Sequence, residues 1–240
     1  MNLKSVMMVA VIGFGVNATA GGPLLKSPED IKREPEPKTV SLRPAGIPIE
    51  KKTPLLVYLH CKTSSPQESQ SVMEPLVESW KCSLLMPCGS IKMGYKGETA
   101  VYDWNGQDDE ARIVKAIKET PGIDTKSVFL IGFSAGGFMA YQTALNHPEL
   151  FKGVLVLAGD IPRKTLSDDK VKATQPKIPF YLVHGTKDQF FPPARGEKAL
   201  AYLKANGFPA VLKTYDGSHF FPDDWFGTIK DAIDWFGSQK

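Results

Sequence analysis

The spacing of apolar residues alternates between two patterns along most of this chain. After residue 54, short apolar runs of the length of a buried strand are separated by longer stretches with helical spacing. The apolar runs are Leu55–Leu59, Ser83–Met86, Val128–Phe133, Gly153–Ala158, Phe180–Val183 and Val211–Tyr215. Strands that alternate with helices predict a mostly parallel, twisted sheet with helices on both faces. We therefore expect one α/β domain over residues 53–240.

Two of the intervening stretches have a clear helical face. The first begins near Asp108, carries Ile113 and Ile117 on one side, and stops at Pro121–Gly122. In the second, apolar residues recur at helical spacing from Trp225 to Phe236. Only about twenty residues separate the strands that end near 158 and begin near 180, too few for a helical lid domain. We expect an open site.

The N-terminus has the pattern of an export signal. Lys4 precedes the apolar run Val6–Val16, and Ala18–Ala20 offers a small-residue cleavage site. The run is shorter than the roughly 20 residues that span a bilayer. Residues 1–20 are therefore interpreted as a cleaved signal peptide, which predicts a secreted or periplasmic protein with no stable membrane insertion.

Residues 21–52 are rich in proline and charge, a composition that buries little apolar surface. We expect a loosely packed N-terminal segment, with a short edge strand at Val40–Leu42. Residues 1–20 contain one of the 29 Lys and Arg residues and none of the 26 Asp and Glu residues. The rest of the chain therefore carries 28 basic and 26 acidic residues. Because these charges are scattered, no nucleic-acid partner is expected.

The cysteines are Cys61, Cys82 and Cys88. Cys61 and Cys88 follow strands that we expect to be neighbours, so an oxidising destination predicts a disulfide between them, with Cys82 as a free thiol. Cys82 and Cys88 flank one strand and would lie about 20 Å apart. Neither a C-x-x-C pair nor an H-E-x-x-H motif is present. No metal or other cofactor is expected.

Ser134 is the candidate nucleophile. It lies in Gly132-Phe133-Ser134-Ala135-Gly136, a G-x-S-x-G motif between an apolar strand and a stretch with helical spacing. Such a turn exposes the serine in a strained conformation and leaves room only for hydrogen at its flanking positions. The alternative is a glycine-rich turn with an incidental serine.

A serine hydroxyl needs a base to accept its proton. His219 follows the last predicted strand in a glycine-containing loop, and we assign it as the base. His60 and His184 each end a strand and are expected to be structural. His147 follows the helix after Ser134 and is expected to cap it.

The acid that orients the base should lie between Ser134 and His219 in the chain. Asp188, in His-Gly-Thr-Lys-Asp after a predicted strand, is the preferred candidate. Asp160, one strand earlier, is the rival. The oxyanion of the reaction would be met by the backbone N–H of Ala135 and by that of Cys61, after the strand that ends at His60.

These motifs resemble a known superfamily. Gly-Phe-Ser-Ala-Gly-Gly-Phe at 132–138, His-Gly-Thr-Lys-Asp at 184–188 and Gly-Ser-His-Phe at 217–220 are similar to the α/β hydrolases. Within these, the chain is nearest the lidless carboxylesterase/phospholipase and polyhydroxybutyrate-depolymerase or feruloyl-esterase-like group. The resemblance covers about residues 40–238. It implies a single-domain α/β-hydrolase fold, with Ser134, Asp188 and His219 as the catalytic triad of an esterase.

The ester itself is not identified by the sequence. An open site favours small-molecule or polymer-linked esters. Four aromatic residues on loops near the proposed site are candidates to line it: Trp104, Phe190, Phe191 and Phe220. Two alternatives stay open, a peptidase of the same fold and an inactive hydrolase-fold binding module. The oligomeric state is not predicted.

Overall fold

The computed structural model describes residues 38–239. The predicted signal peptide and most of the proline-rich segment lie outside these residues, so their interpretation stays a prediction. Within residues 38–239, no helix combines the length and the apolar character needed to cross a membrane.

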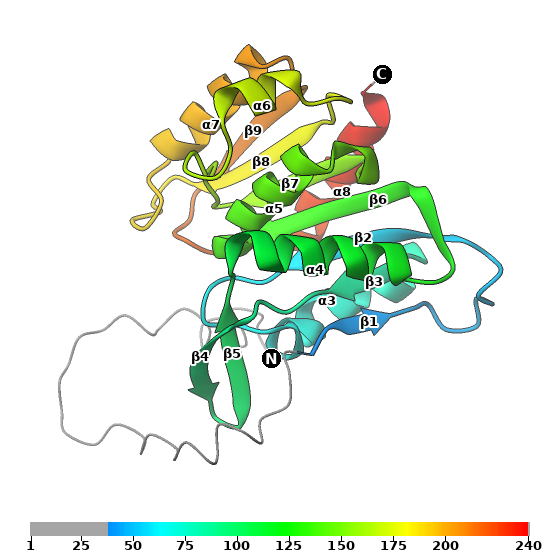
Figure 1. Cartoon of the computed structure of the whole chain (residues 1–240). Coiled ribbons are helices and arrows are strands. Elements are labelled where there is room, and N and C mark those ends of the chain that lie inside the picture. The colour runs from blue at the N-terminus through cyan, green and yellow to red at the C-terminus, as the bar shows by residue number, and fades with distance from the viewer. Residues whose placement is uncertain (1–37, 240) are drawn as a thin grey trace, which may run out of the picture. The chain divides into compact units, whose positions relative to one another are not determined.

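A seven-stranded sheet forms the centre of the described part of the chain (Figure 1). Its strands, in spatial order, are β1 (Val40–Leu42), β3 (Ser83–Met86), β2 (Thr53–Leu59), β6 (Ile123–Phe133), β7 (Gly153–Leu157), β8 (Phe180–Gly185) and β9 (Ala210–Tyr215). Only β1 pairs antiparallel, against β3, and every other pair is parallel. The prediction of a mostly parallel α/β sheet is confirmed.

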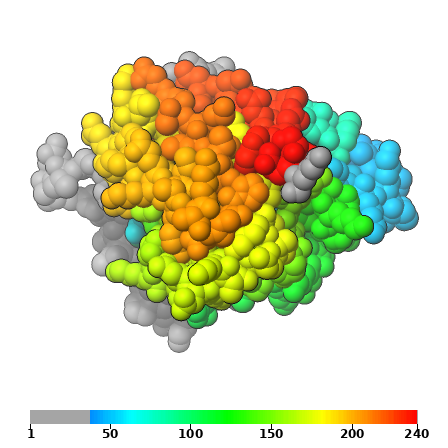
Figure 2. All heavy atoms as spheres, turned by 90° about the horizontal axis from the view of Figure 1, so that it is seen from above, coloured from blue at the N-terminus to red at the C-terminus, as the bar shows by residue number. Residues whose placement is uncertain are grey.

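Helices cover both faces of this sheet. Figure 1 shows α4 and α5 on the near face and α3 and α8 on the far face. The helices are α3 (Pro66–Trp80), α4 (Gly106–Glu119), α5 (Ala135–Asn146), α6 (Asp168–Ala173), α7 (Ala194–Ala205) and α8 (Trp225–Ser238), with a 3-10 turn at Pro148–Leu150. In the space-filling view of Figure 2, the C-terminal part of the chain, coloured yellow to red, covers much of the visible face, with green, cyan and blue parts of the chain at its right.

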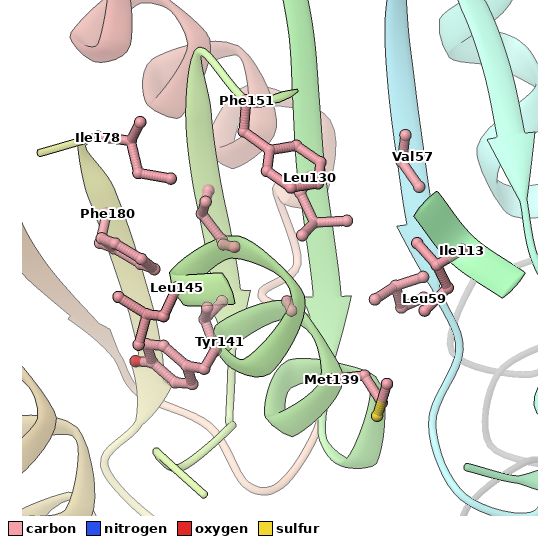
Figure 3. Packing of buried hydrophobic residues seen from close by; sticks show 14 of the residues in the cluster. Val57, Leu59, Ile113, Leu130, Met139, Tyr141, Leu145, Phe151, Ile178 and Phe180 are labelled. Carbon is pink, nitrogen blue, oxygen red and sulfur yellow. The ribbon is translucent and has the colours of Figure 1, made fainter. Parts of the chain in front are cut away.

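Alternate residues of each strand point to opposite helix layers. In β6, Leu130 belongs to the apolar cluster that α4 and α5 complete, whereas its neighbour Phe129 stacks on Phe236 of α8. Figure 3 shows the first cluster, in which side chains of β2, β6 and β8 meet those of α4 and α5. Because both faces are buried, the strands read as continuous apolar runs, and this property made them recognisable in the sequence.

The folded unit begins earlier than residue 53. It starts at Thr39, because β1 pairs with β3 and Arg43 holds the segment that follows. The Arg43 guanidinium donates to the carbonyl oxygens of Gly122, Pro48 and Lys51 at 2.6–2.9 Å. Arg43 thus ties the stretch after β1 to the residue before β6, an interaction that composition does not reveal.

A two-stranded antiparallel hairpin was not expected. Its strands β4 (Ile91–Lys96) and β5 (Thr99–Asp103) stand apart from the main sheet in Figure 1. The exposed face of β4 carries Ile91, Met93 and Tyr95. The alternation of exposed apolar residues in β4 is the sequence pattern that indicates a strand here. The hairpin buries little apolar surface, however, and lacks the continuous apolar run of the central strands.

The predicted disulfide is wrong. All three cysteines are buried free thiols. Strands β2 and β3 are neighbours as expected, but the two thiols have different charged neighbours. Cys61 lies near Glu68 and Lys96, whereas Cys88 lies near Asp109 and Arg112. Burial raises the pKa of the Cys61 thiol to about 11 and that of Cys88 to about 12, so both are protonated at neutral pH.

Candidate active site

Ser134 lies in the turn between β6 and α5 with a left-handed backbone, at φ 55° and ψ −115°. A non-glycine residue in this region is strained by about 1–3 kcal/mol. Its own N–H donates to Leu157 O at 2.9 Å, and its carbonyl accepts from the N–H groups of Gly137 and Phe138. The residue is 9% exposed. The turn therefore holds the hydroxyl at the carboxyl edge of the sheet.

Gly136 allows this turn to approach strand β2. A Cβ atom at Gly136 would lie 2.1 Å from Leu59 O and 2.6 Å from His60 O. At Gly132, on the other side of Ser134, a Cβ would lie 2.3 Å from Gly136 O. Only glycine leaves space for these backbone contacts. The start of α5 is thus pressed against the end of β2, where the predicted oxyanion donor Cys61 follows.

Three side chains that are distant in sequence form one hydrogen-bonded chain. His219 Nε2 lies 2.8 Å from Ser134 Oγ, and His219 Nδ1 lies 2.7 Å from Asp188 Oδ2. Because a carboxylate only accepts, Nδ1 carries the hydrogen, which leaves Nε2 to accept from the serine hydroxyl. The His219 side chain is 10% exposed and that of Asp188 is fully buried. This arrangement can remove a proton from Ser134.

Asp188 is fixed by its own loop. Its Oδ1 accepts from the backbone N–H groups of Phe190 and Phe191 at 2.9 and 2.8 Å. The other oxygen is left for His219. Asp188 thus has one oxygen for its loop and one for the imidazole, which is the geometry needed to orient a histidine.

Asp160 is engaged elsewhere. Its carboxylate pairs with Arg195 at 2.9 Å and accepts from the N–H of Ile161 at 2.8 Å. The preference for Asp188 over Asp160 as the partner of His219 agrees with this geometry.

The loop that carries His219 is tied to the loop of Asp188. The N–H groups of Thr186 and Lys187 donate to Tyr215 O and Gly217 O. The Tyr215 hydroxyl donates to Ser218 O at 3.0 Å and also to Phe220 O. Burial raises the pKa of Tyr215 to about 12, so its hydroxyl keeps the proton that it donates. Hydrogen bonds to backbone oxygens thereby hold the histidine loop on both sides of His219.

Aromatic rings surround the imidazole of His219. The rings of Phe133, Phe190 and Phe191 have centroids 5.3–5.4 Å from it. Phe190 is 55% exposed and can contact a bound molecule. Phe191 also packs edge-on against Phe138, and Phe220 is half-buried directly after His219. The rings of Phe190 and Phe191 therefore lie beside His219, and the assignment of these residues and Phe220 as substrate-lining stays a prediction.

Trp104 packs against the end of β2. It is 9% exposed, its indole N–H donates to His60 O at 2.8 Å, and its ring stacks on that of His60 at 4.5 Å. Its indole N–H is therefore already bonded within the protein, and its assignment as a substrate-lining residue stays a prediction.

His60 is a buried structural histidine. Its Nδ1 lies 2.8 Å from Cys61 O and its Nε2 lies 3.0 Å from the N–H of Gly89. Since Gly89 must donate and the carbonyl must accept, the imidazole is neutral with its hydrogen on Nδ1. Burial lowers its pKa from 6.5 to about 4.

The other two histidines also have structural partners. His184 Nε2 donates to Phe191 O at 2.6 Å, and His147 follows the last residue of α5 and contacts Glu110 at 3.1 Å. Among residues 38–239, no group of three or more His, Cys, Asp or Glu side chains is placed to hold a metal ion.

A serine, a histidine and an aspartate in chain order Ser, Asp, His at the carboxyl edge of a parallel sheet define the α/β-hydrolase class. The family of phospholipases and carboxylesterases matches residues 48–236, and the chain belongs to this family.

The individual proteins named below are similar to this chain at low sequence identity. Carboxylesterase SOBER1 of Arabidopsis thaliana is 28% identical over 118 residues, which cover 45% of this chain and 52% of the relative. A probable inactive carboxylesterase of Oryza sativa subsp. japonica is 26% identical over 117 residues, which cover 45% and 48%. The matches thus span about half the length of these relatives. The crystal structure of esterase PE8 has the same fold, with a TM-score of 0.66 at 22% identity over 82% of this chain and 97% of that one.

Gly136→Ala should destabilise the protein by about 1–3 kcal/mol, because the new methyl group overlaps the backbone of β2. Urea denaturation measures this. Gly237→Ala is the matched control, since it is also a helical glycine but its Cβ would meet nothing within 4 Å. It should leave stability unchanged or raise it by up to about 1 kcal/mol. Equal effects in the two variants would contradict the close packing at Gly136.

His60 makes stability depend on pH. The unfolded state binds a proton near pH 6.5 and the folded state only near 4, so the unfolded state binds more protons between these values and stability falls as the pH falls. His60→Gln removes this titration. We expect the difference in unfolding free energy between wild type and variant to shrink by about 2 kcal/mol from pH 7 to pH 5. A constant difference in urea denaturation over this range would show that His60 is not buried in its neutral form.

Proposed function

We propose that this protein is an exported serine hydrolase that cleaves carboxylic esters through an acyl-enzyme on Ser134. The observation that carries the proposal is the unbroken hydrogen-bond chain from Ser134 through His219 to Asp188, with distances of 2.8 and 2.7 Å. Membership of the phospholipase and carboxylesterase family supports the choice of an ester bond.

The geometry supports a two-step reaction. Ser134 Oγ attacks the ester carbonyl carbon while His219 Nε2 takes the hydroxyl proton, and Asp188 stabilises the imidazolium. The negative charge on the former carbonyl oxygen is met by the N–H groups of Ala135 and Cys61. Ala135 is the first residue of α5, where a helix leaves its N–H groups without intrahelical acceptors. His219 then protonates the leaving alcohol, and water, activated by the same histidine, releases the acid and restores Ser134.

The surroundings favour small or polymer-linked esters. Between β7 and β8 the chain forms only the six-residue helix α6, so this connection contributes no lid. The exposed ring of Phe190 beside His219 offers an apolar contact for the acyl or alcohol group. The same absence of a large insertion disfavours a gated peptidase.

An inactive binding module is the second candidate, because one relative is named a probable inactive carboxylesterase. The intact serine, histidine and aspartate contacts favour the enzyme instead.

Export is supported by the pattern of residues 1–20, with Lys4, an apolar run and Ala18–Ala20 before Gly21. Such a protein would act outside the cytoplasm, secreted or periplasmic. N-terminal sequencing of protein recovered from the medium or periplasm should begin at Gly21. Recovery of the whole uncleaved chain from the cytoplasm alone would refute export.

Ser134→Ala should lower kcat for p-nitrophenyl esters by about 10⁴ or more while the thermal unfolding curve is retained, because the covalent step loses its nucleophile. A fluorophosphonate probe should label the wild type and not the variant. Turnover within tenfold of wild type, or labelling that persists in the variant, would remove Ser134 from the reaction.

Two aspartate variants test the acid. Asp188→Asn should lower kcat by as much as about 10⁴, because His219 loses the carboxylate that orients it. Asp160→Asn is the matched control, since it disrupts only the pair with Arg195 at the surface. Ester hydrolysis by both variants is compared after each is shown to melt like wild type. Severe loss in Asp160→Asn with near-normal turnover in Asp188→Asn would reverse the assignment.

A further inference from the structure

A buried histidine lies beside the Asp188 loop, which is the stretch 186–193 between β8 and α7. His184 is the last residue but one of β8 and is 2% exposed. Its backbone pairs with Thr214 of β9, so the sheet fixes its position. Helix α7 packs against the ring, because a Cβ atom at Gly196 would lie only 3.0 Å from His184 Nδ1. The strand and the helix together hold the imidazole in place.

The His184 imidazole holds the far part of the Asp188 loop. Its Nε2 lies 2.6 Å from Phe191 O. Because a carbonyl oxygen only accepts, Nε2 carries the hydrogen and donates it. The same nitrogen lies 3.6 Å from Asp188 Oδ2, too far for a hydrogen bond. His184 therefore reaches the carboxylate through Phe191 and not directly.

Phe191 connects His184 with both Asp188 and His219. Its carbonyl oxygen accepts the bond from His184, and its N–H donates to Asp188 Oδ1 at 2.8 Å. Its ring stacks on the imidazole of His219, with the two centroids 5.3 Å apart. Three groups of one residue thus contact the histidine of β8, the acid and the base.

The sequence around Phe191 leaves few backbone donors for tying the loop to the sheet. The N–H groups of Phe190 and Phe191 are already used on Asp188. The next two residues, Pro192 and Pro193, have no N–H groups. The bond from the His184 side chain takes the place of a backbone bond between this stretch and β8.

We infer that His184 is a positioning residue for the acid of the triad, which through Phe191 keeps the Asp188 carboxylate directed at His219. This role rests on the proposed function. The carboxylate must keep its place while the imidazole takes the serine proton, and a misplacement of about 1 Å can cost about 10²-fold in rate. The sheet supplies the fixed reference, and the bond from His184 transmits it to the loop.

Two variants separate the hydrogen bond of His184 from the volume of its ring. His184→Gln and His184→Leu both remove the imidazole, but only the glutamine amide can still donate to Phe191 O. In His184→Leu, kcat for a p-nitrophenyl ester should fall about 10- to 100-fold with KM changed less than about threefold, because the acid acts on the chemical step. His184→Gln should keep kcat within about fivefold of wild type. Equal losses in the two variants would overturn the role of the hydrogen bond.

His147→Leu is the matched control. It also removes a histidine that contacts a neighbouring side chain, but it lies at the opposite end of α5 from Ser134. Its kcat should stay within about twofold of wild type. A loss as large as that of His184→Leu would show that removing any bonded histidine lowers turnover, and would contradict a specific role for His184.

A double-mutant cycle tests whether His184 acts through the acid. Asp188→Asn has already lost the carboxylate, so adding His184→Leu should lower kcat by less than about threefold more. Losses that multiply would show that His184 acts independently of Asp188, and would overturn the inference. A wild type that neither hydrolyses p-nitrophenyl esters nor reacts with a fluorophosphonate at Ser134 would instead refute the proposed function.

NMR of protein with ¹⁵N-labelled histidine reports on the acid directly. The proton between His219 Nδ1 and Asp188 Oδ2 should resonate downfield of ordinary imidazole N–H protons, because its bond is short and charge-assisted. The resonance should keep its position in His184→Gln and move upfield or broaden in His184→Leu. An unchanged resonance in His184→Leu would overturn the positioning role.

The wild type alone provides a test that does not depend on the folding of a variant. The Nε2 proton of His184 should exchange slowly with solvent, because it is buried and bonded to Phe191 O. Exchange at the rate of a free imidazole would show that the bond to the loop is not maintained, and would overturn the inference.

Discussion

The left-handed backbone of Ser134 is the constraint around which the site is organised. A residue with a side chain adopts φ 55° and ψ −115° only where its surroundings force it, and here the force comes from packing on both sides. Strand β6 is buried between two helix layers, and α5 begins at once against the end of β2. The glycines at 132 and 136 permit this contact. The packing that stabilises the sheet thereby also fixes the position of the Ser134 hydroxyl group.

The remaining parts of the site come to Ser134 because parallel strands end at one edge. Asp188 follows β8 and His219 follows β9, while Cys61 follows β2. Short backbone bonds between the loops of Asp188 and His219 keep the imidazole at hydrogen-bond distance from both partners. After β2, the buried side chains of His60 and Trp104 bond the carbonyl oxygens of Cys61 and His60. The serine, histidine and aspartate side chains thus lie at hydrogen-bond distance from one another, as electrostatic preorganisation requires.

Most of this arrangement could be predicted from the sequence, because buried parallel strands are continuous apolar runs and the serine turn needs glycine at fixed positions. The hairpin β4–β5 was missed because its strands bury little apolar surface. The start of the folded unit depends on Arg43, whose contacts reach segments far along the chain. The disulfide prediction failed since neighbouring strands do not determine which way a thiol points. The bond from the Trp104 indole to His60 O joins residues far apart in the chain, so no local pattern predicts it.

The most direct test is a crystal structure of the wild type after reaction with a fluorophosphonate. The account predicts phosphorus bonded to Ser134 Oγ, with the phosphoryl oxygen about 2.7–3.1 Å from the backbone nitrogens of both Ala135 and Cys61. An adduct on another residue, or a phosphoryl oxygen directed away from Cys61, would contradict it.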